Sequence, residues 1–197
     1  YIMYLLINNS YNDLNPKATP MLIKYFSKKK IEIKVINTKY DLVKHLKNKK
    51  KIKGIILSGS DLSYSENFCH NMLDINILAL LEFDIPILGI CFGFQTIGLF
   101  YGGTINRLKN LNKGKQKINL YKNELFNNIT NNNFYQYHQD YLVKIPPNFK
   151  IIAKEKKIIN GIKHKDKPIY GVQFHPELSG NTGFKIIDNF IHICTNY

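Results

Sequence analysis

One stretch decides the fold: Ile85-Pro86-Ile87-Leu88-Gly89-Ile90-Cys91-Phe92-Gly93-Phe94-Gln95, in which an apolar strand runs directly into a helix. The same alternation continues on both sides of it. Apolar strands are predicted at residues 3–7, 31–36, 54–57, 85–90 and 169–174, and helices at residues 16–29, 41–46, 71–83, 92–101 and 182–193. Uniformly apolar strands that alternate with helices are typical of a parallel sheet covered on both faces.

The segment between residues 107 and 170 has a different character. Residues 107–121 and 141–170 contain short strand patterns separated by turn residues, and residues 127–133 predict a polar loop. Asn160-Gly161 lies between isoleucines, which is a strong signal for a two-residue hairpin turn. No linker or internal repeat divides the sequence. We therefore predict one α/β domain over residues 1–197, with a mostly parallel sheet flanked by helices and a small antiparallel excursion.

Composition excludes several classes of protein. The 197 residues are enough for a substantial core, the mean hydropathy is −0.24, and no apolar stretch approaches the ~20 residues of a membrane helix. The net charge is +14, but 27 of the 28 basic residues are lysine and only Arg107 is arginine. Because arginine supplies the bidentate grip on bases and phosphates, this balance argues against nucleic acid. The lysines are either solvated surface or a docking surface for an acidic partner.

The cysteine count indicates a reducing compartment. Cys69, Cys91 and Cys194 are an odd number, no two of them form a C-x-x-C pair, and the sequence opens without a secretory leader. We expect reduced thiols and a cytoplasmic protein.

Cys91 is the candidate nucleophile. It stands between Gly89 and Gly93 in the G-x-nucleophile-x-G pattern, in which glycines let the chain turn sharply and expose the nucleophile above a sheet. A thiol at the start of a helix also faces the positive end of the helix dipole, which favours the thiolate. The alternative interpretation is a buried apolar cysteine between two glycines that pack closely.

A second motif supplies the partners that a nucleophilic cysteine needs. His175-Pro176-Glu177 follows directly after the last apolar strand. A base must lie within hydrogen-bond reach of the nucleophile, and a third group usually orients that base. His175 and Glu177 can fill these two roles, and the proline between them restricts the backbone.

With these two motifs the sequence resembles the class I (triad) glutamine amidotransferases, which carry G-x-C-x-G-x-Q and a late strand that ends in H-P-E. The resemblance extends over nearly the whole chain. Residues 145–153 and 168–177 look most like the amidotransferase subunit or domain found in GMP synthases. The glutaminase subunits of anthranilate and aminodeoxychorismate synthases are the nearest rivals. The resemblance implies a flavodoxin-like amidotransferase fold.

The resemblance also implies a chemistry. Cys91 would attack the carboxamide of glutamine to give a γ-glutamyl thioester and ammonia, His175 would transfer the proton, and Glu177 would orient His175. Water would then release glutamate. The backbone N–H groups of Phe92 and Ser60 would form the oxyanion hole, each worth ~3 kcal/mol of barrier.

The loop that carries Ser60 departs from the family. Where the family has Ser-Gly-Gly-Pro, this sequence reads Ser58-Gly59-Ser60-Asp61. Either the oxyanion hole forms with Ser60 in an ordinary backbone region, which we favour, or activity stays weak until a partner docks.

The remaining site residues follow from the resemblance as well. Gly59 and Gln95 match substrate-binding positions, and residues 137–141 match the loop that grips the α-amino and α-carboxyl ends of glutamine, which suggests Gln139 and Asp140. His138 is either structural or part of this loop. Cys69 and Cys194 match no motif and are expected to be packing residues.

Some motifs are absent from the sequence. It has no phosphate-binding loop, no dinucleotide fingerprint and no His/Cys metal spacing. We expect no cofactor and no metal. The ammonia would pass to an ATP pyrophosphatase (synthetase) subunit on another chain or on a further C-terminal part. A stand-alone γ-glutamyl hydrolase and a non-catalytic regulatory protein that retains the fold are the alternatives.

Overall fold

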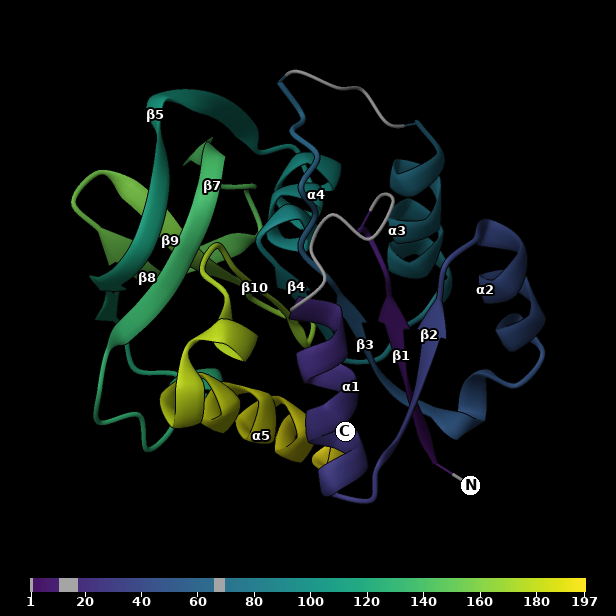
Figure 1. The fold of residues 1–197 in the computed structure, drawn as a ribbon. Coiled ribbons are helices and arrows are strands. Elements are labelled where there is room, and N and C mark those ends of the chain that lie inside the picture. Colours follow the sequence, from purple (N-terminus) through teal and green to yellow (C-terminus); the bar gives the residue numbers. More distant parts are fainter. Residues whose placement is uncertain (1, 11–17, 66–69) are drawn as a thin grey trace.

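A central sheet organises the protein, whose structure is a computed structural model (Figure 1). Within the described residues, which are 2–10, 18–65 and 70–197, this sheet has eight strands in the order β2-β1-β3-β4-β10-β9-β8-β6. The first five of these strands run parallel and the last three are antiparallel. The prediction of a mostly parallel α/β sheet with an antiparallel excursion is therefore confirmed.

The strands and helices have the following bounds. The parallel strands are β1 (Met3–Ile7), β2 (Glu32–Ile36), β3 (Ile52–Leu57), β4 (Ile87–Ile90) and β10 (Ile169–Val172). The antiparallel strands are β6 (Asn119–Leu120), β8 (Phe149–Glu155) and β9 (Ile158–His164). A separate antiparallel pair consists of β5 (Thr104–Lys117) and β7 (Asn133–Lys144). The helices are α1 (Ala18–Lys28), α2 (Lys39–Leu46), α3 (His70–Glu82), α4 (Phe92–Phe100) and α5 (Gly180–Asn196), with short 3₁₀ turns η1 (Lys49–Lys51), η2 (Glu124–Phe126) and η3 (Pro176–Leu178).

Two layers of helices cover the sheet. Because successive side chains of a strand point to opposite faces, Tyr4 and Leu6 of β1 pack with α1 and α5, whereas Leu5 and Ile7 pack with α2, α3 and α4. Figure 1 shows α1 and α5 together on one side of the sheet. Strands β1, β3, β4 and β10 are thus buried on both faces, as the sequence predicts, whereas the edge strand β2 alternates between exposed and partly buried residues.

The parallel strands end at a common edge of the sheet. The residues that follow β3, β4 and β10 are Ser58, Cys91 and Gln173. Two backbone hydrogen bonds connect these strand ends. The N–H of Gly93 donates to the carbonyl of Ser58 (3.2 Å), and the N–H of Cys91 donates to the carbonyl of Val172 (2.8 Å). Motifs that are distant in sequence therefore meet at the carboxyl ends of the strands, where ligands bind in open α/β sheets.

The predicted hairpin turn at Asn160-Gly161 is wrong. Both residues lie inside β9, and the turn between β8 and β9 contains Lys156, whose φ is 49°. Packing explains the difference, because a Cβ on Gly161 would lie 2.9 Å from the Cβ of Ala153 at a register shift between the two strands. Asn160 is buried and accepts a hydrogen bond from the side chain of Gln136 (2.6 Å).

Other boundaries also differ from the predictions. Residues 137–141 belong to strand β7 and not to a loop, and residues 104–117 form one long strand instead of several short ones. The two segments pair with each other over most of their length, so each satisfies the backbone groups of the other. The predicted start of the first helix at Asn15-Pro16, and Cys69, lie outside the described residues.

No helix in the described part of the chain is long and apolar enough to cross a membrane.

Candidate active site

Cys91 stands at a strained turn between β4 and α4. Its φ of 51° and ψ of −101° are rare for a residue with a side chain. The flanking glycines make the turn possible: a Cβ on Gly89 would lie 2.6 Å from the carbonyl of Gly93, and one on Gly93 would lie 2.3 Å from the carbonyl oxygen of Leu57. The strand, strained turn and helix together form the elbow that the sequence motif predicts.

His175 and Glu177 form a buried pair beyond the end of β10. The Nδ1 atom of His175 lies 2.7 Å from Oε1 of Glu177, and each residue is only 1% exposed. Burial by itself lowers the pKa of His175, but the charges of Glu177 and Cys91 outweigh it and hold this pKa well above its usual value. The raised pKa favours the imidazolium form of His175, with Glu177 as its acceptor.

Helix α5 and the turn η3 fix the position of Glu177. Ser179 donates to the backbone carbonyl of His175 (2.6 Å), and a Cβ on Gly183 would lie 1.8 Å from the carbonyl oxygen of Pro176. Only glycine permits this approach of the closing helix to the turn. The His-Pro-Glu segment is thus held by the packing of the helix that follows it.

Gly59 marks the point where the nucleophile and the histidine meet. A Cβ at this residue would lie 2.9 Å from Cε1 of His175 and 3.5 Å from the Cβ of Cys91. The Nε2 atom of His175 is buried and has no hydrogen-bond partner among the described residues, while Cys91 contributes to its raised pKa. The structure therefore brings Cys91, His175 and Glu177 together in the order that a catalytic triad requires.

The loop after β3 keeps an ordinary backbone. Neither Gly59 nor Ser60 is among the residues with positive φ. Asn9 fixes the start of this loop, because its backbone N–H donates to Oγ of Ser58 (2.9 Å) and its side chain donates to the Ser58 carbonyl (2.8 Å). This geometry corresponds to the favoured alternative, in which Ser60 needs no left-handed conformation.

A cavity of about 260 Å³ opens beside Cys91. Ser60 and Phe92, the two predicted oxyanion donors, both line it. Tyr64 covers Phe92, because the two rings stack at 4.4 Å with an angle of 5° between their planes. The predicted site residues that line this cavity are Ser60, Cys91, Phe92, Gln95, Gln139 and Asp140.

Gln95 and Gln173 connect the helix to the nucleophile. The amide nitrogen of Gln95 donates to the Asp140 carbonyl (2.8 Å) and to Oε1 of Gln173 (3.2 Å). The amide nitrogen of Gln173 in turn lies 3.6 Å from Sγ of Cys91. The sequence motif contains Gln173, but sequence reasoning gave it no role.

The Asp140 carboxylate is occupied by protein donors. Ser63 (2.7 Å) and the backbone N–H of Ser65 (3.0 Å) donate to Oδ2, whereas the Ser65 hydroxyl (2.6 Å) and Arg107 (3.2 Å) donate to Oδ1. Although burial raises the pKa of this carboxyl, these hydrogen bonds and the charge of Arg107 lower it overall. Asp140 therefore anchors the segment that carries Ser63 and Ser65 beside the cavity, and the direct substrate contact that the resemblance implies stays a prediction.

Arg107 completes this anchor and is a second residue that sequence reasoning missed. It also donates to the side-chain oxygen of Gln139 (2.8 Å) and to the hydroxyl groups of Ser63 (2.6 Å) and Ser65 (2.8 Å). The one signal in the sequence was that this is the only arginine among 28 basic residues.

His138 is held by both ring nitrogens. Nδ1 lies 2.9 Å from the Asp140 carbonyl and Nε2 lies 3.1 Å from the amide nitrogen of Asn112. Burial lowers the pKa of His138 to about 4, so the ring is neutral at pH 7 and donates from Nδ1. Of the two interpretations of His138, this arrangement favours the structural one.

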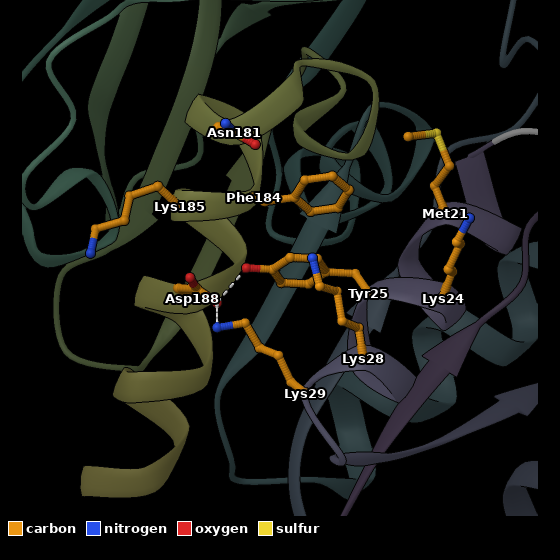
Figure 2. A pocket seen from close by; sticks show the side chains of 9 residues that line it. All are labelled: Met21, Lys24, Tyr25, Lys28, Lys29, Asn181, Phe184, Lys185 and Asp188. Atoms are coloured by element: carbon orange, nitrogen blue, oxygen red, sulfur yellow. Dashed lines mark hydrogen bonds and ion pairs between the residues drawn. The ribbon is translucent and has the colours of Figure 1, made fainter.

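A larger cavity lies between α1 and α5, away from Cys91 (Figure 2). We call it the α1–α5 groove; it has a volume of about 690 Å³. Its floor contains Tyr25 and Phe184, which stack at 4.1 Å. Asp188 pairs with Lys29 (2.7 Å) and accepts a hydrogen bond from Tyr25 (2.8 Å). The groove also has three further lysines, which form no ion pair with any described residue: Lys24, Lys28 and Lys185.

Cys194 lies away from the cavity beside Cys91 and is a packing residue. It is buried, with its Sγ 2.5 Å from where a Cβ on Gly54 would lie, and burial raises the pKa of its thiol.

In the parts of the chain that the structure describes, no group of three His, Cys, Asp or Glu residues could hold a metal ion.

Comparisons with known proteins agree with this geometry. The family described as "Glutamine amidotransferase class-I" matches residues 12–194. The chain is 39% identical over 157 residues to a Methanocaldococcus jannaschii protein named as a subunit of glutamine-hydrolyzing GMP synthase, covering 77% of this chain and 79% of that protein. It is 40% identical over 170 residues to the protein of the same name from Methanococcus aeolicus, covering 84% of this chain and 86% of that protein.

A solved structure shows the same fold. The crystal structure of a Thermoplasma acidophilum protein, described as a GMP synthase subunit, superposes with a TM-score of 0.84, covers 100% of this chain and 95% of that chain, and is 24% identical. The family match over almost the whole length, with the elbow and the His-Glu pair in place, leads to one conclusion: the chain belongs to the class-I glutamine amidotransferases.

Proposed function

We propose that this protein is the glutaminase component of a glutamine-hydrolysing GMP synthase. One observation carries the proposal: Cys91 stands at a strained elbow beside the buried His175–Glu177 pair. The similarity to proteins named as GMP synthase subunits supports the choice of this synthetase over the anthranilate and aminodeoxychorismate synthases.

The first half of the proposed reaction releases ammonia. The thiolate of Cys91 attacks the side-chain carbonyl carbon of glutamine, and the carbonyl oxygen becomes an oxyanion held by the backbone N–H groups of Phe92 and Ser60. The imidazolium of His175 then gives its proton to the departing nitrogen. The C–N bond breaks, ammonia leaves, and a γ-glutamyl thioester remains on Cys91.

The second half regenerates the enzyme. His175, now neutral, takes a proton from water as that water attacks the thioester, and the C–S bond breaks to release glutamate. Glu177 keeps the Nδ1 proton of His175 in place, so that Nε2 faces the reacting atoms in both steps. The buried Nε2, which accepts or donates no hydrogen bond among the described residues, is suited to this role.

The substrate occupies the cavity beside Cys91 in this proposal. Gly59 leaves room for the His175 ring, and Gln95 lines the cavity with its amide nitrogen already held by Asp140 and Gln173. Gln139 lines the same cavity from strand β7. Asp140 acts indirectly, since it holds the loop of residues 60–65 against β7.

The proposal includes a partner and a location. Ammonia that escapes into water is protonated and lost, so the glutaminase acts together with a synthetase subunit that has ATP pyrophosphatase activity and uses xanthosine monophosphate. Lys24, Lys28 and Lys185, which form no ion pair with any described residue, give the α1–α5 groove positive charge beside the stacked rings of Tyr25 and Phe184, which fits an acidic surface on that subunit. Figure 2 shows the side chains that line this groove. Both walls of the groove pack on η3, so docking there would reach the turn that carries Glu177. A biosynthetic complex of this kind works in the cytoplasm.

A single assay tests the function. Glutamate release from glutamine is measured for this chain alone and with the ATP pyrophosphatase subunit of a GMP synthase, in the presence of ATP, Mg²⁺ and xanthosine monophosphate. We expect slow hydrolysis by the chain alone, stimulation by the loaded subunit, and formation of GMP. Full-speed hydrolysis with no response to the subunit would instead indicate a stand-alone γ-glutamyl hydrolase. No hydrolysis under either condition would indicate a regulatory protein.

A further inference from the structure

The peptide between Gly59 and Ser60 carries one of the two N–H groups that the proposed reaction uses, and its orientation decides where that N–H points. The Gly59 carbonyl accepts a hydrogen bond from the Ser58 hydroxyl (3.0 Å). In a trans peptide the carbonyl and the N–H point in opposite directions, and the described residues contain no cis peptide bond. The N–H of Ser60 therefore points away from the Ser58 hydroxyl.

The surroundings of Ser58 fix the direction in which its hydroxyl donates. Ser58 is buried, and its Oγ atom accepts a hydrogen bond from the backbone N–H of Asn9 (2.9 Å). Because an N–H can only donate, the single hydroxyl proton of Ser58 is left for the Gly59 carbonyl. The side chain of Asn9 (2.8 Å) and the backbone N–H of Gly93 (3.2 Å) both donate to the Ser58 carbonyl. Contacts from the end of β1 and from α4 thus hold Ser58 in place.

The two N–H groups proposed for the oxyanion hole are available in this arrangement. The backbone N–H groups of Ser60 and Phe92 donate to no acceptor within the described residues, and both residues line the cavity beside Cys91. On the far side of the peptide, the Ser60 hydroxyl accepts a hydrogen bond from the N–H of Leu62 (3.0 Å). Donors that are in place before the charge develops cost no reorganisation during the reaction.

The opposite orientation of the peptide is unfavourable. To turn it over would break the hydrogen bond from Ser58 and would drive the φ of Ser60 toward positive values, as when a type I turn becomes a type II turn. Ser60 has a Cβ atom, which disfavours positive φ, and its φ is not positive in the structure. Where the family has a second glycine, this chain therefore has a residue that resists the change.

We propose that Ser58 is a positioning residue, whose hydroxyl keeps the oxyanion hole preformed by fixing the peptide between Gly59 and Ser60. This inference rests on the proposed glutaminase function. Ser58 acts through the N–H of Ser60 and not by contact with the substrate. It follows that a partner subunit does not need to turn this peptide, so its stimulation acts on another part of the site.

The test separates the orientation of the peptide from general damage to the site. Ser58→Ala removes the hydroxyl, and Ser58→Thr retains it. Thr38→Ala is the matched control, because it also removes a hydroxyl that accepts a backbone N–H, that of Asp41 (3.1 Å), at the exposed start of α2. For each protein we measure kcat and KM from glutamate release, together with the melting temperature. All assays include the synthetase subunit if it stimulates the wild type.

We expect Ser58→Ala to lower kcat about 10- to 100-fold, because loss of a whole oxyanion donor costs about 100- to 1000-fold and this variant only releases one. The KM for glutamine should change less than about 3-fold, since the N–H acts on the oxyanion. Ser58→Thr and Thr38→Ala should keep kcat within about 3-fold of the wild type. Alkylation of Cys91 by iodoacetamide, which forms no oxyanion, should proceed at the wild-type rate in every variant.

A second background tests whether the effect passes through the N–H of Ser60. Ser60→Pro removes this N–H, and no hydrogen bond within the described residues is lost with it. In the Ser60→Pro background, Ser58→Ala should therefore lower kcat less than about 2-fold further. If Ser58→Ala does not fold, Ser58→Thr and Ser58→Val take its place, because they have the same shape and differ in the hydroxyl.

Three outcomes would overturn the inference. The first is an unchanged kcat in folded protein that lacks the Ser58 hydroxyl. The second is an equal fall in kcat and in the iodoacetamide rate, which would mean that the variant disturbs Cys91. The third is an undiminished effect of Ser58→Ala in the Ser60→Pro background. Failure of the proposed function is seen separately, because the wild type would then release no glutamate from glutamine.

Discussion

Replacing Glu177 by Gln isolates the contribution of one charge to the site. The amide has nearly the same shape as the carboxylate, so the variant removes the negative charge 2.7 Å from Nδ1 of His175 and leaves the packing of η3 intact. A hydrogen bond to a charged group is worth about 1.5–3 kcal/mol. If the whole of this free energy stabilises the transition state, loss of the hydrogen bond to the charged group lowers kcat about 10- to 150-fold.

The pH profile gives the same experiment a second readout. Glu177 helps to hold the pKa of His175 well above its usual value, so the imidazolium persists to higher pH. Without that charge the pKa of His175 falls. The alkaline limb of the kcat profile should therefore move to lower pH, while Cys91→Ala should leave no measurable turnover at any pH.

The assay is glutamate release in saturating glutamine between pH 6 and pH 10, with circular dichroism as a check on folding. Glu155→Gln, a change of the same type at a carboxylate on β8 that pairs with Lys156, is the matched control. An alkaline limb that does not move in a folded Glu177→Gln protein would refute the electrostatic role. If Glu177→Gln lost glutamate release as completely as Cys91→Ala, Glu177 would do more than support His175.

Three further predictions follow from other parts of the structure. A diazo-ketone analogue of glutamine should label Cys91 and leave Cys69 and the buried Cys194 unmodified, as peptide mass spectrometry would show. Gly59→Ala should lower kcat at least ~10-fold without unfolding the protein, because the added Cβ would lie 2.9 Å from the His175 ring; unchanged kinetics would contradict the contact. Replacing Lys24, Lys28 and Lys185 of the α1–α5 groove by Gln should abolish stimulation by the synthetase subunit, and 0.5 M salt should weaken this stimulation in the wild type, whereas basal hydrolysis should not change.

Acid stability gives one more test. Burial raises the pKa of Glu124, but hydrogen bonds from Lys163 and Tyr170 lower it to about 2. A carboxyl whose pKa is depressed in the folded state stabilises the fold above its unfolded pKa of about 4.5, and this contribution is lost as the pH falls toward 2. Glu124→Gln should therefore make the unfolding temperature less dependent on pH in this window, which calorimetry at several pH values would detect.

The elements that the sequence predicts well are those with local causes. The elbow depends on two glycines within two residues of Cys91, and the parallel strands β1, β4 and β10 are runs without a charged residue. Both signals are complete within a few residues. His175 and Glu177 are also adjacent to a strand end, so their meeting with Cys91 follows once the sheet is known to be parallel.

Contacts between distant segments account for what the sequence does not reveal. Strand β5 is rich in lysine and asparagine and has no apolar alternation, so it is a strand only because β7 pairs with it. Asn160-Gly161 has the composition of a turn, but the close approach of Ala153 overrides that local preference. Arg107 reaches Asp140, which is 33 residues away in the sequence, and no local pattern encodes that distance.

The backbone of Cys91 has a consequence for any attempt to improve this protein. A conformation of this kind, with φ of 51° and ψ of −101°, costs a residue with a side chain about 1–3 kcal/mol. Glycine would adopt it without that cost, and in a protein of this size each kcal/mol corresponds to about 2–4 °C of melting temperature. Directed evolution for heat resistance alone would therefore favour the loss of the thiol, so a library of this protein has to be screened for ammonia release in every round.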